Sequence, residues 1–362
     1  MTGSPHVPLV RTLTLDSFRP ETLDAAVTGG AVDHVQLARG RFVGQLVHAD
    51  LPGSVFDYGA YNLPLLACGG MPADRVVLGF VASDVDVGNL NGAEVRDAAV
   101  VALAEGSELH YRLAPRTRWM ALHVPRATLE QAGVALDDAQ VTFPRRETAP
   151  LQQIQELVTN AVGTLLAIEQ RDPQILDPAA AALGVAETLT ATFAAALPPA
   201  DGIDAQQRIL RKRRLRLVKR TREFFEASLC HPIQVTQLCE YVGASVRTLE
   251  RAFAETCGAN PKQLLTLMRL ARARRALLAA DPGETTVSRI AAECGFFHLG
   301  RFSTSYAKLF GESPSVTLRS DDPGAHTSPV SSGTGPCRRR PSEERYIPCD
   351  GDKNPGARPG HA

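Results

Sequence analysis

The sequence predicts an α+β chain of several domains: a β-sandwich or barrel, a helical segment, and an all-α C-terminal domain with two helix-turn-helix motifs. Three observations predict this order. The spacing of apolar residues changes from strand-like to helical near residue 149. One pattern of apolar residues occurs twice near the C-terminal end, and basic residues gather around it. At 362 residues, the chain is long enough for two domains with separate cores.

Residues 1–148 are expected to form the β-rich domain. Its short apolar segments are separated by Gly, Pro, Asn and Asp, and they lie at 41–51, 75–90, 98–113 and 118–125. Strands of this kind are typical of a β-sandwich or a small barrel, which can hold a small ligand among apolar walls. The candidates to line such a pocket, each of which also suits the core, are Tyr58, Tyr61, Tyr111 and Trp119.

Residues 149–199 are expected to form a helical dimerisation segment. Two stretches with helical spacing, 151–170 and 180–197, flank the helix-breaking sequence RDPQILDP. The first stretch carries a wide apolar stripe that another surface must cover. A second copy of the chain is one such surface, and the β domain is the alternative. The stripe consists of Leu151, Ile154, Leu157, Val158, Val162 and Leu165.

The C-terminal domain contains a duplicated pattern. The first copy comprises Val235, Leu238, Gly243, Leu249, Phe253, Gly258 and Pro261. The second copy comprises Val287, Ile290, Gly295, Phe302, Tyr306, Gly311 and Pro314. The offset is 52 residues up to the first glycine and 53 after it, so one unit has been duplicated with a single insertion.

Each copy predicts a short helix, a tight turn and a second helix. The apolar residues keep helical spacing on both sides of Gly243 and Gly295, and glycine tolerates the left-handed backbone that such a turn requires. Ser245 is placed to cap the helix after the first turn. In a helix-turn-helix motif the second helix enters the major groove of DNA.

Three stretches of this domain match a known pattern: VTQLCEYVGASVRTLERAF, LLTLMRLARARRALL and VSRIAAECGFFHLGRFSTSYAKLFGESPS. With these stretches, residues 206–319 resemble the DNA-binding domain of the AraC/XylS family of transcriptional regulators. The resemblance implies sequence-specific binding to promoter DNA and contact with RNA polymerase. It also implies a cupin-like sensor domain, a homodimer and a response, more often activation, to a small-molecule effector.

The distribution of charge agrees with a DNA-binding domain. The whole chain has 39 basic and 39 acidic residues, so its net charge is zero. Residues 1–205 hold 13 basic and 24 acidic residues, whereas 206–319 hold 20 and 9. Basic residues release counterions from the phosphate backbone, so we expect the affinity for DNA to fall steeply with salt.

Helical phase separates the residues expected to face bases from those expected to face the core. In the first recognition helix Leu249 and Phe253 face inward, and Arg247 and Arg251 share another face. The family pattern places both arginines near base edges, where arginine binds guanine with two hydrogen bonds. Glu250 is expected either to accept a hydrogen bond from cytosine or to hold an arginine in place.

In the second recognition helix Phe302, Tyr306 and either Leu309 or Phe310 are expected to face inward. This helix departs from the family pattern at two other positions. Phe297 is expected at the position of the helix cap, and Gly300 replaces a residue that often contacts a base. The remaining candidates for base contact are His298, Arg301 and Thr304, with phosphate contact as an alternative for Arg301. Residues expected to contact the DNA backbone are Arg213, Arg214, Ser245, Ser303 and Lys308.

The helix between the two copies is expected to set their distance, because it presents an apolar face to both. Two recognition helices on one side of a duplex need a spacing near one turn of DNA, about 34–36 Å. If the helix does not match that spacing, the DNA must bend. The apolar face consists of Leu264, Leu267, Leu270 and Leu277.

Two other functions remain open at this stage: a cupin-type metalloenzyme with an appended DNA-binding domain, and a DNA binder that needs no ligand. The histidines of the β domain, His34, His48, His110 and His123, do not have the spacing of neighbouring metal ligands. The seven cysteines form no CxxC pair. We therefore expect no catalytic residues, metal or cofactor.

The sequence also bears on localisation and on the C-terminal end. No run of about 18 apolar residues and no basic-then-apolar leader is evident, so we expect a cytoplasmic protein that does not span a membrane. Residues 320–362 are rich in Pro, Gly, Ser and Arg, and they are expected to form a disordered tail.

Overall fold

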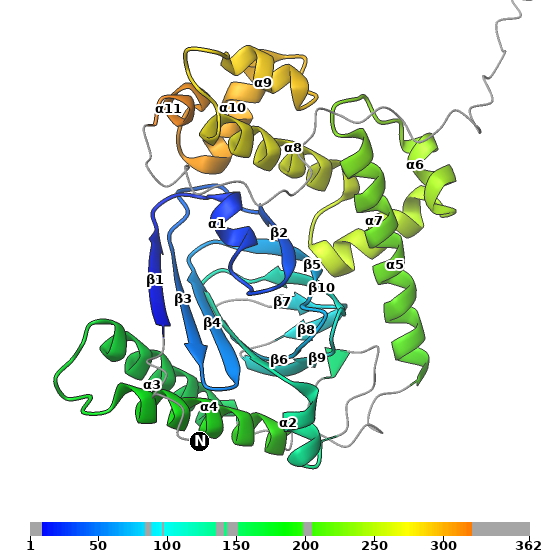
Figure 1. Cartoon of the computed structure of the whole chain (residues 1–362). Helices are drawn as coiled ribbons and strands as arrows, with labels where there is room; N and C mark the ends of the chain where they lie inside the picture. The colour runs from blue at the N-terminus through cyan, green and yellow to red at the C-terminus, as the bar shows by residue number, and fades with distance from the viewer. Residues whose placement is uncertain are drawn as a thin grey trace, which may run out of the picture. The chain divides into compact units, whose positions relative to one another are not determined.

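The computed structural model describes residues 9–83, 88–95, 98–134, 141–142, 151–197 and 205–320, apart from the side chains of 141–142, 205–209 and 211–212 (Figure 1). The segment predicted as a disordered tail, apart from Ser320, lies outside the described residues.

The N-terminal region contains two antiparallel sheets. The larger sheet has the order β1 (Leu9–Leu15), β3 (Gly44–Leu51), β4 (Ser54–Tyr61), β11 (Thr117–Val124), β6 (Val76–Ala82), β9 (Ala98–Leu103) and β12 (Val141–Thr142). The smaller sheet has the order β2 (Ala31–Gln36), β5 (Leu65–Gly70), β10 (Glu108–Leu113), β7 (Gly88–Leu90) and β8 (Ala93–Val95). Two short helices accompany them: α1 (Pro20–Asp24) and α2 (Arg126–Gln131).

Alternation along the strands gives the larger sheet two apolar faces. On β11, Trp119 and Ala121 belong to a buried cluster shared with the smaller sheet, whereas Met120 and Leu122 belong to a second cluster on the opposite face. Side chains thus occupy the space between the sheets as a packed core. Tyr61 and Tyr111 lie in this core and are only 3% and 5% exposed.

Several elements of this region did not have a clear sequence signal. The predicted strands correspond to β3, β6, β7, β9, β10 and β11. The additional elements are β1, β2, β4, β5, β8 and β12 and the helices α1 and α2. Strand β1 alternates weakly, because Leu9 and Leu13 are almost half exposed at the edge of the sheet. Strand β5, in contrast, is continuously apolar over its first four residues, so a period of two is not visible there.

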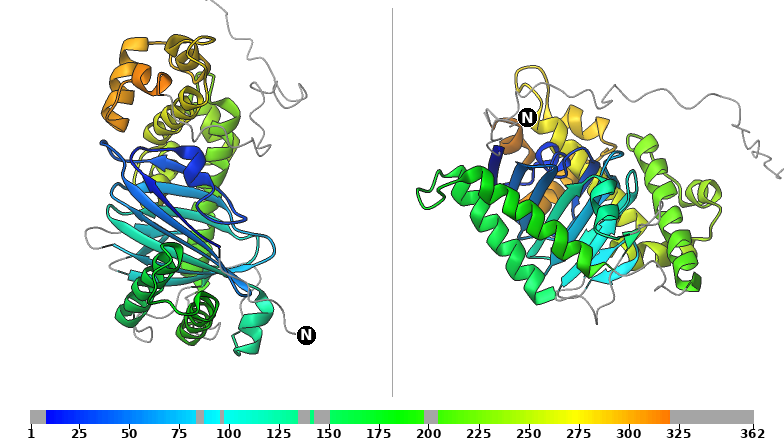
Figure 2. Two further views of the ribbon diagram at one scale, coloured as in Figure 1. Left: turned by 60° about the vertical axis from the view of Figure 1, so that its left-hand side comes forward. Right: turned by 60° about the horizontal axis from the view of Figure 1, so that its bottom comes forward.

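Helices α3 (Leu151–Glu169) and α4 (Pro178–Ala196) cover the outer face of the larger sheet, as Figures 1 and 2 show. They match the two predicted helices closely. The apolar stripe of α3 faces the sheet, and Ile154, Val158 and Leu165 are at most 4% exposed there. The stripe is therefore covered within the chain, so it does not by itself require a second protomer.

Helix α4 bears on the expectation that no segment spans a membrane. Among the described residues, α4 is the one helix that is long enough and apolar enough to cross a membrane, judged by length and composition. Its buried residues, which include Leu189 and Phe193, pack in the cluster against the larger sheet. One third of the tested window is buried. Core helices of other proteins pass the same test of length and composition, so the signal is weak.

The C-terminal region is entirely helical among the described residues. Its helices are α5 (Ala205–Ser228), α6 (Val235–Val242), α7 (Val246–Cys257), α8 (Pro261–Leu278), α9 (Val287–Glu293), α10 (Leu299–Phe310) and α11 (Pro314–Leu318). On α5 the residues that pack are Val218 and Phe225, which are fully or almost fully buried. Leu210, nearer the start of the helix, is 48% exposed.

Helix α8 connects two helix pairs, as predicted. The first helix pair is α6 with α7, and the second helix pair is α9 with α10. Leu264 packs in the cluster of the first pair, whereas Leu270 and Leu277 pack in the cluster of the second. A single helix thus contributes to both cores.

Candidate nucleic-acid interface

In the first helix pair a glycine turn and a serine cap direct the second helix. Gly243 has a left-handed backbone (φ +67°), and its N–H donates to the carbonyl of Cys239. Ser245 is the N-cap of α7, and its hydroxyl accepts from the N–H of Thr248 at 3.3 Å. Both local features match the sequence prediction. They fix where α7 begins, and the helix then buries one side and exposes the other.

In the second helix pair the turn is similar but the cap differs. Gly295 (φ +79°) and Phe296 donate to the carbonyls of Ala292 and Ala291, which closes the end of α9. The N-cap of α10 is His298, which makes no side-chain cap hydrogen bond. The expectation that Phe297 occupies the cap is therefore wrong by one residue.

Helix α7 exposes the face expected to meet bases. Leu249 and Phe253 are buried, while Arg247 and Glu250 are exposed. The side chain of Arg251 is 75% exposed. Among the described residues, Glu250 makes no ion pair, so it does not hold an arginine in place as one interpretation required.

Glu255 performs the arginine-holding role that was considered for Glu250. Its carboxylate lies 2.8 Å from Nε of Arg251 on the same helix and 2.7 Å from Nη1 of Arg214 on α5. Arg214 is consequently half-buried and engaged within the protein, whereas Arg213 is exposed. The spacing of Arg251 and Glu255, four residues on one helix, is the signal that could have revealed this pair.

Helix α10 likewise has a buried and an exposed side. Phe302, Tyr306, Leu309 and Phe310 are buried, as predicted. Arg301, Thr304 and Lys308 are exposed, and Ser303 is half-buried. The hydroxyl of Thr304 donates to the carbonyl of Gly300 at 2.9 Å. Its methyl group and Arg301 thus remain on the exposed side, near the exposed His298 at the start of the helix.

A family model matches part of this helical region. Residues 238–320 match a family model described as a helix-turn-helix domain. The chain is 40% identical over 103 residues to a probable thc operon regulatory protein of Rhodococcus erythropolis, and 35% identical over 101 residues to a XylDLEGF operon transcriptional activator of Pseudomonas putida. This chain carries the DNA-binding domain of an AraC/XylS-family transcriptional regulator. The resemblance to this family that the sequence indicated is confirmed.

The two curated relatives match only part of this chain. Each match covers 28% of this chain, and the chain spans about a third of the length of the two curated relatives, 31% and 32%. A solved structure, a probable AraC family transcriptional regulator from Rhodopseudomonas palustris, is 37% identical to it. That match covers 28% of this chain and 94% of the other, with a TM-score of 0.26.

The β-rich region contacts both helix pairs of the AraC-type domain. Nδ2 of Asn89 on β7 donates to the carbonyl of Glu255 at 3.0 Å, at the end of α7. Nε2 of Gln36 on β2 donates to the carbonyl of Leu309 at 2.7 Å, at the end of α10. The buried Arg274 of α8 donates to the carbonyl of Phe18. Each recognition helix is thus linked to the β-rich region near its C-terminal end.

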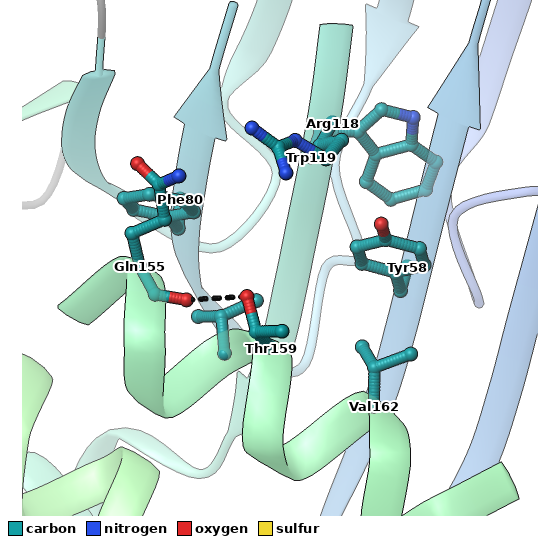
Figure 3. A pocket seen from close by; sticks show the side chains of 8 residues that line it. Tyr58, Phe80, Arg118, Trp119, Gln155, Thr159 and Val162 are labelled. Atoms are coloured by element: carbon teal, nitrogen blue, oxygen red, sulfur yellow. Dashed lines mark hydrogen bonds between the residues drawn. The ribbon is translucent and has the colours of Figure 1, made fainter. Parts of the chain in front are cut away.

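A small cavity lies between the larger sheet and α3. Its volume is about 90 Å³, and Figure 3 shows Arg118, Tyr58 and Phe80 on the sheet opposite Gln155 and Thr159 on the helix. Two of the four aromatic residues proposed from the sequence, Tyr58 and Trp119, line this cavity. Trp119 also belongs to the core between the sheets, together with the other two, Tyr61 and Tyr111. The wall toward α3 was not predicted, because it depends on how the helix packs.

Two histidines of the β-rich region share one buried aspartate. Nδ1 of His48 lies 2.8 Å from one carboxylate oxygen of Asp57, and Nε2 of His123 lies 2.9 Å from the other. Burial opposes ionisation of Asp57, but hydrogen bonds from His123, His48 and the N–H of Thr28 hold its pKa below the ordinary value. The hydrogen bond to Asp57 raises the pKa of His48.

Sequence spacing did not reveal this cluster, because its residues come from β3, β4 and β11 and meet only through strand register. The carboxylate lies between the two imidazoles and contacts each of them. Among the described residues, no group of three or more His, Cys, Asp or Glu side chains is arranged to hold a metal ion.

Proposed function

We propose that the protein is an effector-responsive transcriptional activator that acts in the cytoplasm. In this proposal both helix pairs are helix-turn-helix motifs that bind promoter DNA. Residues 206–319 form the DNA-binding domain, 1–148 a cupin-like sensor and 149–199 a dimerisation segment. The protein acts on RNA polymerase and is not an enzyme. The names of the curated relatives, an operon regulatory protein and an operon activator, support the regulatory part.

One observation carries the DNA-binding part of the proposal. Helix α7 follows a glycine turn, buries Leu249 and Phe253, and exposes Arg247 and Arg251 together on the opposite side. A guanidinium group in that position can donate two hydrogen bonds to O6 and N7 of guanine. Arg213, exposed on α5, is suited to a phosphate.

The test begins with the DNA sequence that the full-length protein selects from a random duplex library. We expect Arg247→Ala to lose discrimination at one or two base pairs of this sequence, while a matched variant of the β-rich region, Arg11→Ala, binds as the wild type does. Arg11 is exposed on β1 and lies far from the helix pairs in sequence. If the library yields no enriched sequence, the proposed function is wrong.

The contacts between the β-rich region and the recognition helices support the proposed response to an effector. An effector changes activity only if it binds one arrangement of the two regions better than another. The hydrogen bond from Asn89 reaches the residue that holds Arg251, and the bond from Gln36 reaches the end of α10. We expect Asn89→Ala with Gln36→Ala to change transcription without effector; an unchanged basal level and response would contradict this linkage.

The cavity beneath α3 is the candidate effector site. Its aromatic and apolar walls and its polar edge, Arg118 and Gln155, suit a small molecule with a flat apolar body and a polar group. Thr159 lines the cavity but is exposed, so the chain should tolerate Thr159→Trp, which fills the space. We expect this variant to bind DNA normally and to lose induction by metabolites that induce the wild type. Retained induction would exclude the cavity.

The proposed dimer requires a surface other than the buried stripe of α3. Helix α4 offers one, because Leu183 is 42% exposed beside the exposed Gly184 and Glu187. Sedimentation should show a dimer that Leu183→Glu converts to a monomer. A monomeric wild type bound to its DNA would contradict the dimerisation proposal while leaving DNA recognition intact.

A further inference from the structure

The first turn of α10 has a glycine where the first turn of α7 has an arginine, and exposed apolar residues flank its cap. Phe297 and Leu299, on either side of the cap residue His298, are 65% and 43% exposed. With the offset of 53 residues, Gly300 occupies the position of Arg247, and Thr304 that of Arg251. Both guanidinium groups of the first helix are therefore missing from the corresponding positions of the second.

Packing within the protein does not account for Phe297. A hydrophobic residue before an N-cap often packs against the fourth residue of the helix, here Phe302. In this structure the neighbouring Phe296 does so instead, with its ring centroid 4.9 Å from that of Phe302. Phe297 is left with most of its surface exposed. An exposed aromatic residue of this size is suited to a binding partner.

Neither the backbone conformation nor the packing seen in the described part of the chain requires a glycine at position 300. Gly300 does not have a positive φ, and a Cβ atom built on it meets no atom within 4 Å. Gly295, by comparison, needs its positive φ and has the carbonyl oxygen of Leu229 only 2.5 Å from a Cβ position. Glycine lowers the stability of a helix relative to alanine. No contact within the described residues requires glycine at position 300, whereas a partner that approaches the backbone closely would.

The charge around this turn identifies the partner as DNA. Arg301 follows directly on the exposed side, and Lys308 lies further along the same helix. In a recognition helix the N-terminal residues are those that meet base edges. An apolar side chain in the major groove contacts the C5-methyl group of thymine, which no other base presents.

We propose that the second helix pair reads thymine methyl groups through Leu299 and Phe297, and that Gly300 lets the first turn of α10 approach the base edges closely. This proposal rests on the proposed function and deepens it. The first pair then reads hydrogen-bonding groups of guanine, and the second reads apolar groups and the shape of the groove. A promoter site would combine a guanine-containing half with a thymine-containing half.

The direct test removes the methyl group from the DNA. In the duplex selected by the full-length protein, each thymine is replaced singly by deoxyuridine, which retains the same hydrogen-bonding groups. We expect one or two replacements to weaken wild-type binding by about fourfold each, the effect of losing one buried methyl group. Leu299→Ala should bind the normal and the deoxyuridine duplex equally, because the contact is already lost.

Val246→Ala is the matched control, because Val246 occupies the same position in α7 and is 44% exposed. It should remain sensitive to the same deoxyuridine replacements. The proposal is overturned if no replacement weakens binding, or if Leu299→Ala remains as sensitive as the wild type. Failure to select any sequence would instead refute the proposed function, so the two failures are distinguishable.

A second variant tests the role of Gly300. Gly300→Ala should raise the melting temperature, because alanine favours the helix, and weaken binding to the selected duplex by about tenfold, because the added methyl group prevents close approach. Gly163→Ala in α3 is its control, since a Cβ atom there also meets nothing within 4 Å. It should raise the melting temperature without a change in DNA binding. Normal binding by Gly300→Ala would contradict the close approach.

Discussion

The two helix pairs share their inward residues and differ on their outward faces. Leu249 and Phe253 of α7 correspond to Phe302 and Tyr306 of α10, and all four are buried. On the outward face, the second helix of the first pair has a serine at its N-cap and two arginines. The second helix of the second pair has a histidine at its N-cap, which makes no cap hydrogen bond, and a glycine at the position of the first arginine. The buried residues thus follow one pattern in both copies, whereas the surfaces proposed to meet DNA differ.

The largest expected difference concerns the two turn glycines. Gly243→Ala should lower the free energy of unfolding by about 1–2 kcal/mol. The cost comes from the positive φ alone, because no atom lies within 4 Å of the added Cβ. Alanine at Gly295 also meets the carbonyl oxygen of Leu229 at 2.5 Å, so overpacking of about 1–3 kcal/mol adds to the same strain. Denaturant unfolding of both variants measures the difference. Equal losses would show that the two turns are equivalent.

The next difference concerns base discrimination. Arg247→Ala should remove about 1–3 kcal/mol of preference at a guanine, because a bidentate hydrogen-bonded contact is lost. Affinities for a panel of single-base variants of the selected duplex measure this preference. The equivalent position of the second pair, Gly300, has no side chain to lose. A uniform loss over all sequences would place Arg247 on the phosphate backbone instead.

Helix capping provides a smaller difference. Ser245→Ala should lower the free energy of unfolding by about 1 kcal/mol, because the N–H of Thr248 loses its acceptor. His298→Ala should leave it within about 0.5 kcal/mol of the wild type, since His298 makes no cap hydrogen bond. Thermal or denaturant unfolding without DNA tests the pair. A larger loss for His298→Ala would mean that its side chain stabilises α10.

The smallest expected effect belongs to the backbone contacts. Arg213→Ala should weaken binding to all duplexes alike and reduce the slope of log affinity against log salt by about 1, because one phosphate contact is lost. Arg214→Ala should affect stability as well, since Arg214 is paired with Glu255. Binding titrations at several salt concentrations separate the two. A sequence-dependent loss for Arg213→Ala would contradict its assignment.

The repeated helices were predictable because their signals are local. A glycine that needs a positive φ, a serine before a helix and apolar residues every three or four positions all act within a few residues of themselves. These signals located α3, α4 and both helix pairs, and they identified Leu249, Phe253, Phe302 and Tyr306 as inward. The exposed faces followed from the same phase.

Features that depend on distant segments were not predictable. The pairing of Glu255 with Arg214 joins two helices, and the contact of His48 and His123 with Asp57 joins three strands. Helical spacing alone also did not show that the stripe of α3 is covered by the sheet. In each case the deciding quantity is the packing of one element on another, which residue spacing does not contain.

In the proposed complex both recognition helices occupy the major groove of one duplex. Hydroxyl-radical footprinting of the full-length protein on its selected DNA measures this directly. We predict that each protomer protects two segments on one face of the duplex, about 10–10.5 base pairs apart, and that Arg301→Ala weakens only the second. A single protected segment per protomer, unchanged by Arg301→Ala, would contradict a reading role for the second helix pair.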